Sequence, residues 1–184
     1  LSGAALRFAT LQIAAGASTT ATSDLTVTQD LIVDGAMTAS GTSATIGVDL
    51  TVNGSLSGAT NLTISHDIRM PGAFTGTGQV RLIGTATSEI YSGTFASLEI
   101  AKTGTTSTQL RGAALVTGNL RLTSGTFTVS VGTHTMAVGG DLLLDGPRVT
   151  ATADPQLGER GRAYEPPPRH VRRIVGTPAV TMGG

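Results

Sequence analysis

Short apolar phrases with a polar residue at their centre recur along most of this chain. The fullest version reads D-L-x-[V/L]-[D/N]-G and occurs at residues 30–35, 49–54 and 141–146, with a looser copy at 67–72 and front halves at 97–100 and 119–122. In Leu50-Thr51-Val52 apolar and polar side chains alternate, which is typical of a strand with one buried face. Asx-Gly at the end of the full copies favours a turn. The pattern predicts short strands separated by tight corners.

The spacing of the copies predicts a coiled architecture. They begin at positions 30, 49, 67, 97, 119 and 141, so the spacing is nearly regular except for one long step from 67 to 97. Repeats of this length that stack on one another form solenoids. We predict an all-β fold, a parallel β-solenoid (β-helix) of about 18–22 residues per turn, in which seven coils at about 4.8 Å each form a rod roughly 30–35 Å long. We interpret the long step as an enlarged or partial extra coil.

Alternation also predicts which side chains form the core. Further copies of the front half begin at Asp24 and Asn61, each shortly before a copy that begins at Asp30 or Asp67. In each copy the residues on either side of the central polar residue should face inward. The predicted inward pairs include Leu50 and Val52, Leu62 and Ile64, and Leu120 and Leu122.

The composition changes after residue 146. Residues 147–184 contain six of the seven prolines and six of the 12 basic residues, with three acidic ones, whereas residues 1–146 contain six basic and nine acidic residues. We predict a β-solenoid repeat domain at 1–146 and an irregular Pro/Arg-rich tail at 147–184. Because the charges are opposite, we expect the tail to dock on the solenoid of a neighbouring copy, or alternatively on its own.

The composition excludes several classes of function. Only 13% of residues are charged and 3% are aromatic, and there is no cysteine, so thiol chemistry is excluded. The solenoid region lacks the basic stripe that nucleic-acid binding needs. No apolar run reaches the length of about 18 residues that crosses a membrane as a helix, so we expect no membrane insertion.

Acidic residues recur at the start of the copies: Asp24, Asp30, Asp49, Asp67 and Asp141. Carboxylates in register could bind calcium or act as a catalytic pair, as in polysaccharide-cleaving β-helix enzymes. However, equal charges on adjacent coils would repel, and Asn61, Ser97 and Asn119 occupy the same place in other copies. We therefore predict that each acidic side chain caps a corner by accepting backbone N–H bonds.

The remaining motifs give no catalytic, cofactor-binding or metal site. His66, His134 and His170 are far apart and lack paired spacing, so we expect solvated or corner residues rather than ligands. Residues 76–78 (GTG) form only a fragment of a phosphate-binding loop. The Thr-x-Thr pairs at 26/28, 126/128 and 133/135 are too irregular for an ice-binding ladder, and the glycosylation patterns at Asn53 and Asn61 depend on the host. Six scattered aromatic residues suggest no carbohydrate platform.

Three segments resemble a known kind of protein. They read GTFASLEI at 93–100, LVTGNLRLTSGTF at 115–127 and VGGDL at 138–142. This wording resembles repeats of large secreted bacterial surface proteins of adhesin type, over roughly residues 24–146. Residues 24–54 also resemble the repetitive shafts of phage tail fibres. The resemblance implies a parallel β-helix outside the cell, and it carries no catalytic residue onto these positions.

From these observations we expect a non-catalytic extracellular or cell-surface structural protein. Its expected partners are copies of itself, because the ends of an open solenoid expose ladder edges that invite end-to-end assembly into a filament or surface layer. A phage tail-fibre or adhesin segment is the alternative, and a polysaccharide-active β-helix enzyme is a more distant one. We expect no cofactor.

Overall fold

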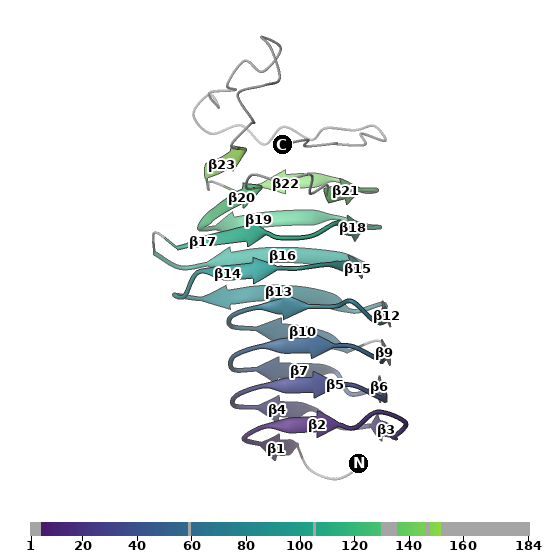
Figure 1. Ribbon diagram of the computed structural model, residues 1–184. Helices are drawn as coiled ribbons and strands as arrows, with labels where there is room; N and C mark the ends of the chain where they lie inside the picture. The colour runs from purple at the N-terminus through teal and green to yellow at the C-terminus, as the bar shows by residue number, and fades with distance from the viewer. Residues whose placement is uncertain (1–4, 59, 105, 130–135, 146–147, 152–184) are drawn as a thin grey trace.

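The computed structural model describes residues 5–58, 60–104, 106–129, 136–145 and 148–151. The regular structure of these residues is entirely β, and every strand pair is parallel. The chain winds as a β-solenoid with three faces, and each full coil contributes one strand to each face (Figure 1). The predicted fold class is therefore confirmed. Among the described residues, none forms a helix that could span a lipid bilayer.

The strands of the three faces follow the chain in rotation. Face 1 consists of β1 (Leu6–Phe8), β4 (Leu25–Val27), β7 (Ser43–Ile46), β10 (Asn61–Ile64), β13 (Gln79–Gly84), β16 (Ser97–Lys102), β19 (Leu120–Ser124) and β22 (Leu142–Leu144). Face 2 consists of β2 (Leu11–Ile13), β5 (Leu31–Val33), β8 (Leu50–Val52), β11 (Ile68–Arg69), β14 (Ser88–Ile90), β17 (Ser107–Leu110), β20 (Thr126–Val129) and β23 (Arg148–Ala151). Face 3 is two sheets: β3 (Ser18–Ala21), β6 (Ala36–Ala39), β9 (Ser55–Gly58) and β12 (Ala73–Gly76), then β15 (Gly93–Phe95), β18 (Ala114–Val116) and β21 (Met136–Val138).

The core is built from columns of branched residues that stack from coil to coil. The predicted inward pairs are buried, and the residue between each pair faces outward. One column on face 1 runs in register through Val27, Ile46, Ile64, Leu82, Ile100 and Leu122. Each coil thus covers the apolar surface of its neighbour, and this burial is the main source of stability in a stacked repeat.

The long step between copies combines a change of face with the enlarged coil that we predicted. The copies at Asp30, Asp49 and Asp67 lead into strands of face 2, whereas those at Ser97, Asn119 and Asp141 lead into strands of face 1. The step therefore joins copies on different faces and is not an extra coil. The predicted enlargement is present on face 2, where Ile68 and Ile90 are 22 residues apart but Leu50 and Ile68 only 18. Along face 1, Leu62 pairs with Val80 and Val80 pairs with Leu98, so two coils of equal and ordinary length span this level.

The coils nevertheless come in two widths. On face 1, β1, β4, β7 and β10 have three or four residues, whereas β13, β16 and β19 have five or six. We call coils 1–4 (β1 to β12) the narrow coils and coils 5–7 (β13 to β21) the wide coils. In Figure 1 the wide coils project beyond the narrow ones on the side where faces 1 and 2 meet. Pairing is weaker between the last narrow coil and the first wide coil. Strands β11 and β14 share a single residue pair, Ile68 with Ile90, and no ladder joins β12 to β15.

Glycine marks the corner between faces 2 and 3 of the narrow coils because the backbones of successive coils approach closely there. A Cβ on Gly54 would lie 1.9 Å from the carbonyl oxygen of Gly35, and one on Gly72 would lie 2.2 Å from that of Gly54. No side chain fits at either distance. The Asx-Gly pairs of the sequence thus serve the stacking of corners.

The ladder continues past the predicted domain boundary at residue 146. Strand β23 pairs with β20 on face 2, so four residues of the predicted tail belong to the solenoid. The rest of the predicted tail, 152–184, and its predicted docking lie outside the described residues.

Candidate functional site

Polar side chains at two corners bind each coil to the next. Where faces 3 and 1 meet, Asp24 Oδ1 accepts from the backbone N–H groups of Thr42 (2.9 Å) and Ser43 (3.0 Å). At the same corner of later coils, Asn61 Oδ1 accepts from Gln79 N–H and Asn119 Oδ1 from Asp141 N–H, both at 2.9 Å. The Ser43 N–H bond is the main reason that the pKa of Asp24 lies below its usual value. Corner capping is thus confirmed for Asp24, and Asn61 and Asn119 cap the same corner in later coils.

A column of three carboxylates lies at the corner between faces 1 and 2. Asp30 Oδ1 accepts from Asp49 N–H (3.2 Å), Asp49 Oδ1 from Asp67 N–H (3.0 Å), and Asp67 Oδ1 from Glu89 N–H (2.8 Å). These side chains also cap the next coil, as predicted. Their equal charges do not prevent this stacking, because the backbone N–H groups hold the three carboxylates in register.

His66 lies between two of these carboxylates. Its Nδ1 is 2.6 Å from Asp49 Oδ1 and 3.7 Å from Asp67 Oδ1. We call Asp49, His66 and Asp67 the corner triad. The prediction of a corner position for His66 is confirmed. The contact with Asp49 was not predicted, and it arises because one turn of the solenoid brings Asp49 beside His66. His134 and His170 lie outside the described residues.

A second charged cluster lies on the outer side of face 2, one coil further along. Arg111 binds Glu89 Oε1 through Nε (2.8 Å) and Nη2 (2.7 Å), and the Tyr91 hydroxyl donates to the other carboxylate oxygen. The Arg69 guanidinium lies 3.8 Å from the centre of the Tyr91 ring. The hydrogen bond from Tyr91, followed by that from Arg111, holds the pKa of Glu89 below its usual range. The same bond raises the pKa of Tyr91.

A lysine lies inside the solenoid where narrow and wide coils meet. The side chain of Lys102 is fully buried, and its Nζ donates to Ser65 O (2.7 Å) and Ile83 O (2.6 Å), in the two coils before its own. Burial lowers the pKa of Lys102 to about 8, against a weaker opposing effect of the Asp67 carboxylate. Ser88 and Thr108 stack on adjacent coils and are fully buried. Within the described residues, their hydroxyls have no hydrogen-bond partner.

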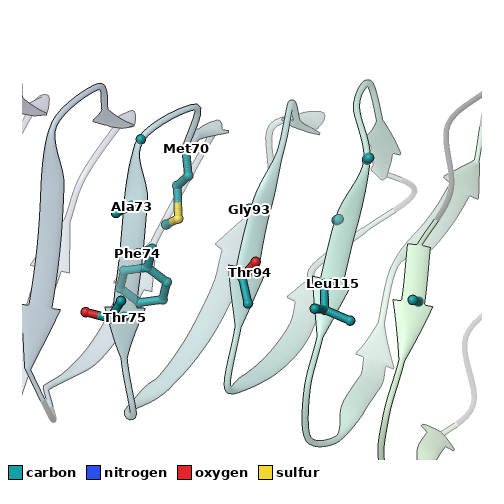
Figure 2. A pocket seen from close by; sticks show the side chains of 11 residues that line it. Met70, Ala73, Phe74, Thr75, Gly93, Thr94 and Leu115 are labelled. Carbon is teal, nitrogen blue, oxygen red and sulfur yellow. The ribbon is translucent and has the colours of Figure 1, made fainter.

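An apolar slot opens on face 3 at the break between β12 and β15. Figure 2 shows Met70 and Phe74 on one side of it, with Gly93, Thr94 and Leu115 on the following coils. The ring of Phe74 lies 6.3 Å from that of Phe95, which is fully buried. These rings are scattered in the sequence, but they meet at the break. The slot lies on a different face from both charged clusters.

Small hydroxyl side chains form an in-register column on the narrow part of face 3. Thr20, Thr38, Ser57 and Thr75 occupy outward positions of successive coils. The Thr-x-Thr pairs considered above did not indicate this column, because none of these four residues belongs to them. The ladder that carries the column ends at β12, because β12 and β15 share no ladder. Beyond the break, Thr94 of β15 is in register with Leu115 of β18 and Ala137 of β21, which carry no hydroxyl.

The burial of Lys102 and the contact between Asp49 and His66 were not predicted, although the sequence contains patterns that indicate both. Extending the alternation of Leu98 and Ile100 by one more step places Lys102 on the inner side of β16. Subtracting the coil length from residue 66 points to the neighbourhood of Asp49. Neither step was possible before each copy was assigned to a face.

Comparison of the chain with models of protein families, with curated proteins and with solved structures finds no match.

Proposed function

We propose that this chain is a non-catalytic structural protein of the cell exterior, a β-solenoid rod that assembles end to end with copies of itself. The proposal rests mainly on one observation: the recurring polar residues hold successive coils together. The side chains of Asp24, Asp30, Asp49, Asp67, Asn61 and Asn119 all bind the backbone of the next coil. The repeated chemistry of the sequence therefore serves stacking.

The electrostatics of the strongest charged cluster also support a structural role. A general acid that works near neutral pH needs a raised carboxyl pKa. Glu89 has a lowered one, because Tyr91 and Arg111 bind its charged form. Such a carboxylate stays ionised and joins coil 5 to coil 6. The extracellular location rests on the resemblance of residues 24–146 to secreted surface proteins.

Assembly would extend the ladders at the first coil. Leu6 and Leu11 donate their N–H groups to coil 2. Since neighbouring residues of a parallel strand point their N–H groups to opposite sides, Arg7 and Gln12 direct theirs away from coil 2. Among the described residues, no strand pairs with this outer edge of β1 and β2. A second copy can supply the missing ladder.

Native mass spectrometry and electron microscopy of the intact chain test the proposal. We expect filaments, and we expect Gln12→Pro to shorten or abolish them, because proline removes an outward N–H that the coil itself does not use. Gln12→Thr keeps this N–H and is the matched control. A monodisperse monomer would overturn the assembly, and a closed trimer would favour a fibre shaft. Polysaccharide cleavage that is lost in Glu89→Gln would overturn the non-catalytic role.

A further inference from the structure

The corner triad presents three metal-ligand atoms at one place on the surface. One ligand atom each from Asp49, His66 and Asp67 lies within 4.8 Å of the other two. The side chains of Asp49 and His66 are each 37% exposed, whereas that of Asp67 is 11% exposed. The site is thus anchored on one buried carboxylate and remains open to solvent.

A second observation concerns the charge balance of the triad. Glu89, Glu99 and Asp145 each form an ion pair with an arginine. Within the described part of the chain, Asp49 and Asp67 have no lysine or arginine at ion-pair distance, and the histidine is their only such partner. Asp67 also interacts over a longer distance with the buried ammonium group of Lys102. One distant ammonium group and one imidazole thus face two stacked carboxylates.

We propose that the corner triad binds one divalent transition-metal ion of the zinc type. Imidazole nitrogen with carboxylate oxygen suits zinc, whereas calcium and magnesium prefer oxygen ligands alone. Three protein ligands leave a fourth tetrahedral position for water, and the exposure of His66 and Asp49 provides room for it. This inference is independent of the proposed assembly.

The geometry needs only a small adjustment to accept the ion. Tetrahedral zinc with ligands at about 2.0–2.2 Å places its ligand atoms roughly 3.3–3.5 Å apart. The present separations from His66 Nδ1 are 2.6 Å to Asp49 and 3.7 Å to Asp67. The shorter contact is a hydrogen bond. An ion bound at Nδ1 would replace this hydrogen bond, with the imidazole in the neutral tautomer that carries its proton on Nε2.

The backbone already orients both carboxylates. Asp49 Oδ1 accepts from Asp67 N–H and Asp67 Oδ1 from Glu89 N–H, so each oxygen keeps a second lone pair for the ion. Such outer contacts fix the direction of a ligand and raise metal affinity. The bound ion would join coil 3 to coil 4 through side chains.

Isothermal titration of the intact, chelator-treated, tag-free chain with zinc chloride tests the site. We expect one ion per chain. Cobalt(II) should give the visible absorption of a tetrahedral nitrogen and oxygen site. We expect His66→Gln to lower zinc affinity by about 100-fold or more, since even outer-shell partners are worth about 10- to 100-fold.

Matched variants decide whether the triad is responsible. His134→Gln and His170→Gln remove the other histidines, and Asp30→Asn removes a carboxylate of the same column outside the triad; all three should bind zinc like the unaltered chain. Circular dichroism identifies any variant that fails to fold, and Asp49→Asn then serves as a second test in place of His66→Gln. No stoichiometric binding, or binding unchanged in both His66→Gln and Asp49→Asn, would overturn the proposal.

Discussion

The narrow and wide coils share the same three faces but fill their interiors differently. In the narrow coils the buried polar residues are Thr60 and Asp67, both at corners. In the described part of the wide coils Ser88, Lys102 and Thr108 are buried at inward positions, whereas Glu99 is buried at an outward position beside Arg81. The longer strands of face 1 move the corner outward, and apolar side chains do not fill the extra space alone. Enlarging a solenoid coil by a few residues thus introduces buried polar groups that need partners.

At the junction between the narrow and wide coils, a buried polar group of a wide coil forms hydrogen bonds with the coils before it. Lys102 belongs to a wide coil, but its ammonium group reaches Ser65 O in the last narrow coil. It supplies hydrogen bonds at the place where coils of different width meet. The unpartnered hydroxyls of Ser88 and Thr108 bring no comparable gain. The comparison therefore predicts opposite effects for substitutions among these buried polar residues.

The largest effect should come from the column of branched residues that crosses both regions. We expect Ile64→Ala in a narrow coil and Ile100→Ala in a wide coil each to lower the free energy of unfolding by about 2–5 kcal/mol, because both side chains are fully buried. Urea denaturation followed by circular dichroism measures this. Thr63→Ala, between Leu62 and Ile64, is the surface control and should stay within about 0.5 kcal/mol. A cost below about 1 kcal/mol for Ile100→Ala would contradict close packing in the wide coils.

Removing the lysine at the junction should have the next largest effect. Lys102→Met keeps most of the side-chain volume but leaves the carbonyls of Ser65 and Ile83 without this donor. We expect a loss of about 1–3 kcal/mol at neutral pH, the usual cost of an unsatisfied buried polar group. Thermal and urea denaturation measure it. An unchanged or increased stability would show that these two bonds are dispensable.

The pH dependence of stability provides a separate test of Lys102. Its pKa is about 8 in the folded chain, against the ordinary lysine value of 10.5 once the chain unfolds, so between these values the unfolded state binds more protons. The contribution of Lys102 to stability should therefore rise from pH 8 to pH 10.5, and below pH 8 it should be constant. Since the neutral amine still has two N–H groups, both carbonyls keep a donor. Urea denaturation across this pH range measures the rise, which should be absent in Lys102→Met.

An unpartnered hydroxyl of the wide coils should be dispensable. We expect Thr108→Val, which replaces a buried hydroxyl by a methyl group of similar size, to raise stability by about 1 kcal/mol. Thr51→Val makes the same change on the outer side of a narrow coil and should stay within about 0.5 kcal/mol. Equal effects of the two substitutions in urea denaturation would remove this difference between the regions.

The smallest effect should come from a corner that both regions share. Asn61→Ala and Asn119→Ala each remove one bond to the backbone of the next coil, so we expect a loss of about 0.5–1.5 kcal/mol from each. Asn61→Asp keeps an acceptor oxygen and should keep most of the stability at neutral pH. Amide hydrogen exchange at Gln79 and Asp141 reports on the same bonds. Slow exchange that persists in the alanine variants would contradict this role of the corners.

Much of the architecture could be predicted because local patterns determine it. Alternation at Leu50-Thr51-Val52 gives the inward side of a strand, and the repeat length gives the coil. The assignment of copies to faces could not be read in the same way, since the same phrase fits any face of a solenoid. For this reason the change of face between Asp67 and Ser97 was not predicted, although the enlarged coil was.

The charged clusters were harder to predict than the strands because they depend on register between coils. Asp49 and His66 meet only because the length of that coil sets Leu50 beside Ile68, and a longer or shorter coil would move the histidine away. Tyr91 lies over Arg69 because Ile68 pairs with Ile90, across a coil that is longer than the one before it. Such offsets follow from the sum of all corner lengths, and a local sequence pattern does not contain that sum.

The interruption of face 3 between β12 and β15 gives the rod a preferred direction of bending. A load that opens face 1 at this level must break the ladder between β10 and β13, whereas a load that opens face 3 separates two strands that share no ladder. Resistance there comes from contacts such as that between the rings of Phe74 and Phe95. The ladders of faces 1 and 2 continue through this level, so these faces form the stiffer side of the rod. The slot lies on face 3, on the more flexible side.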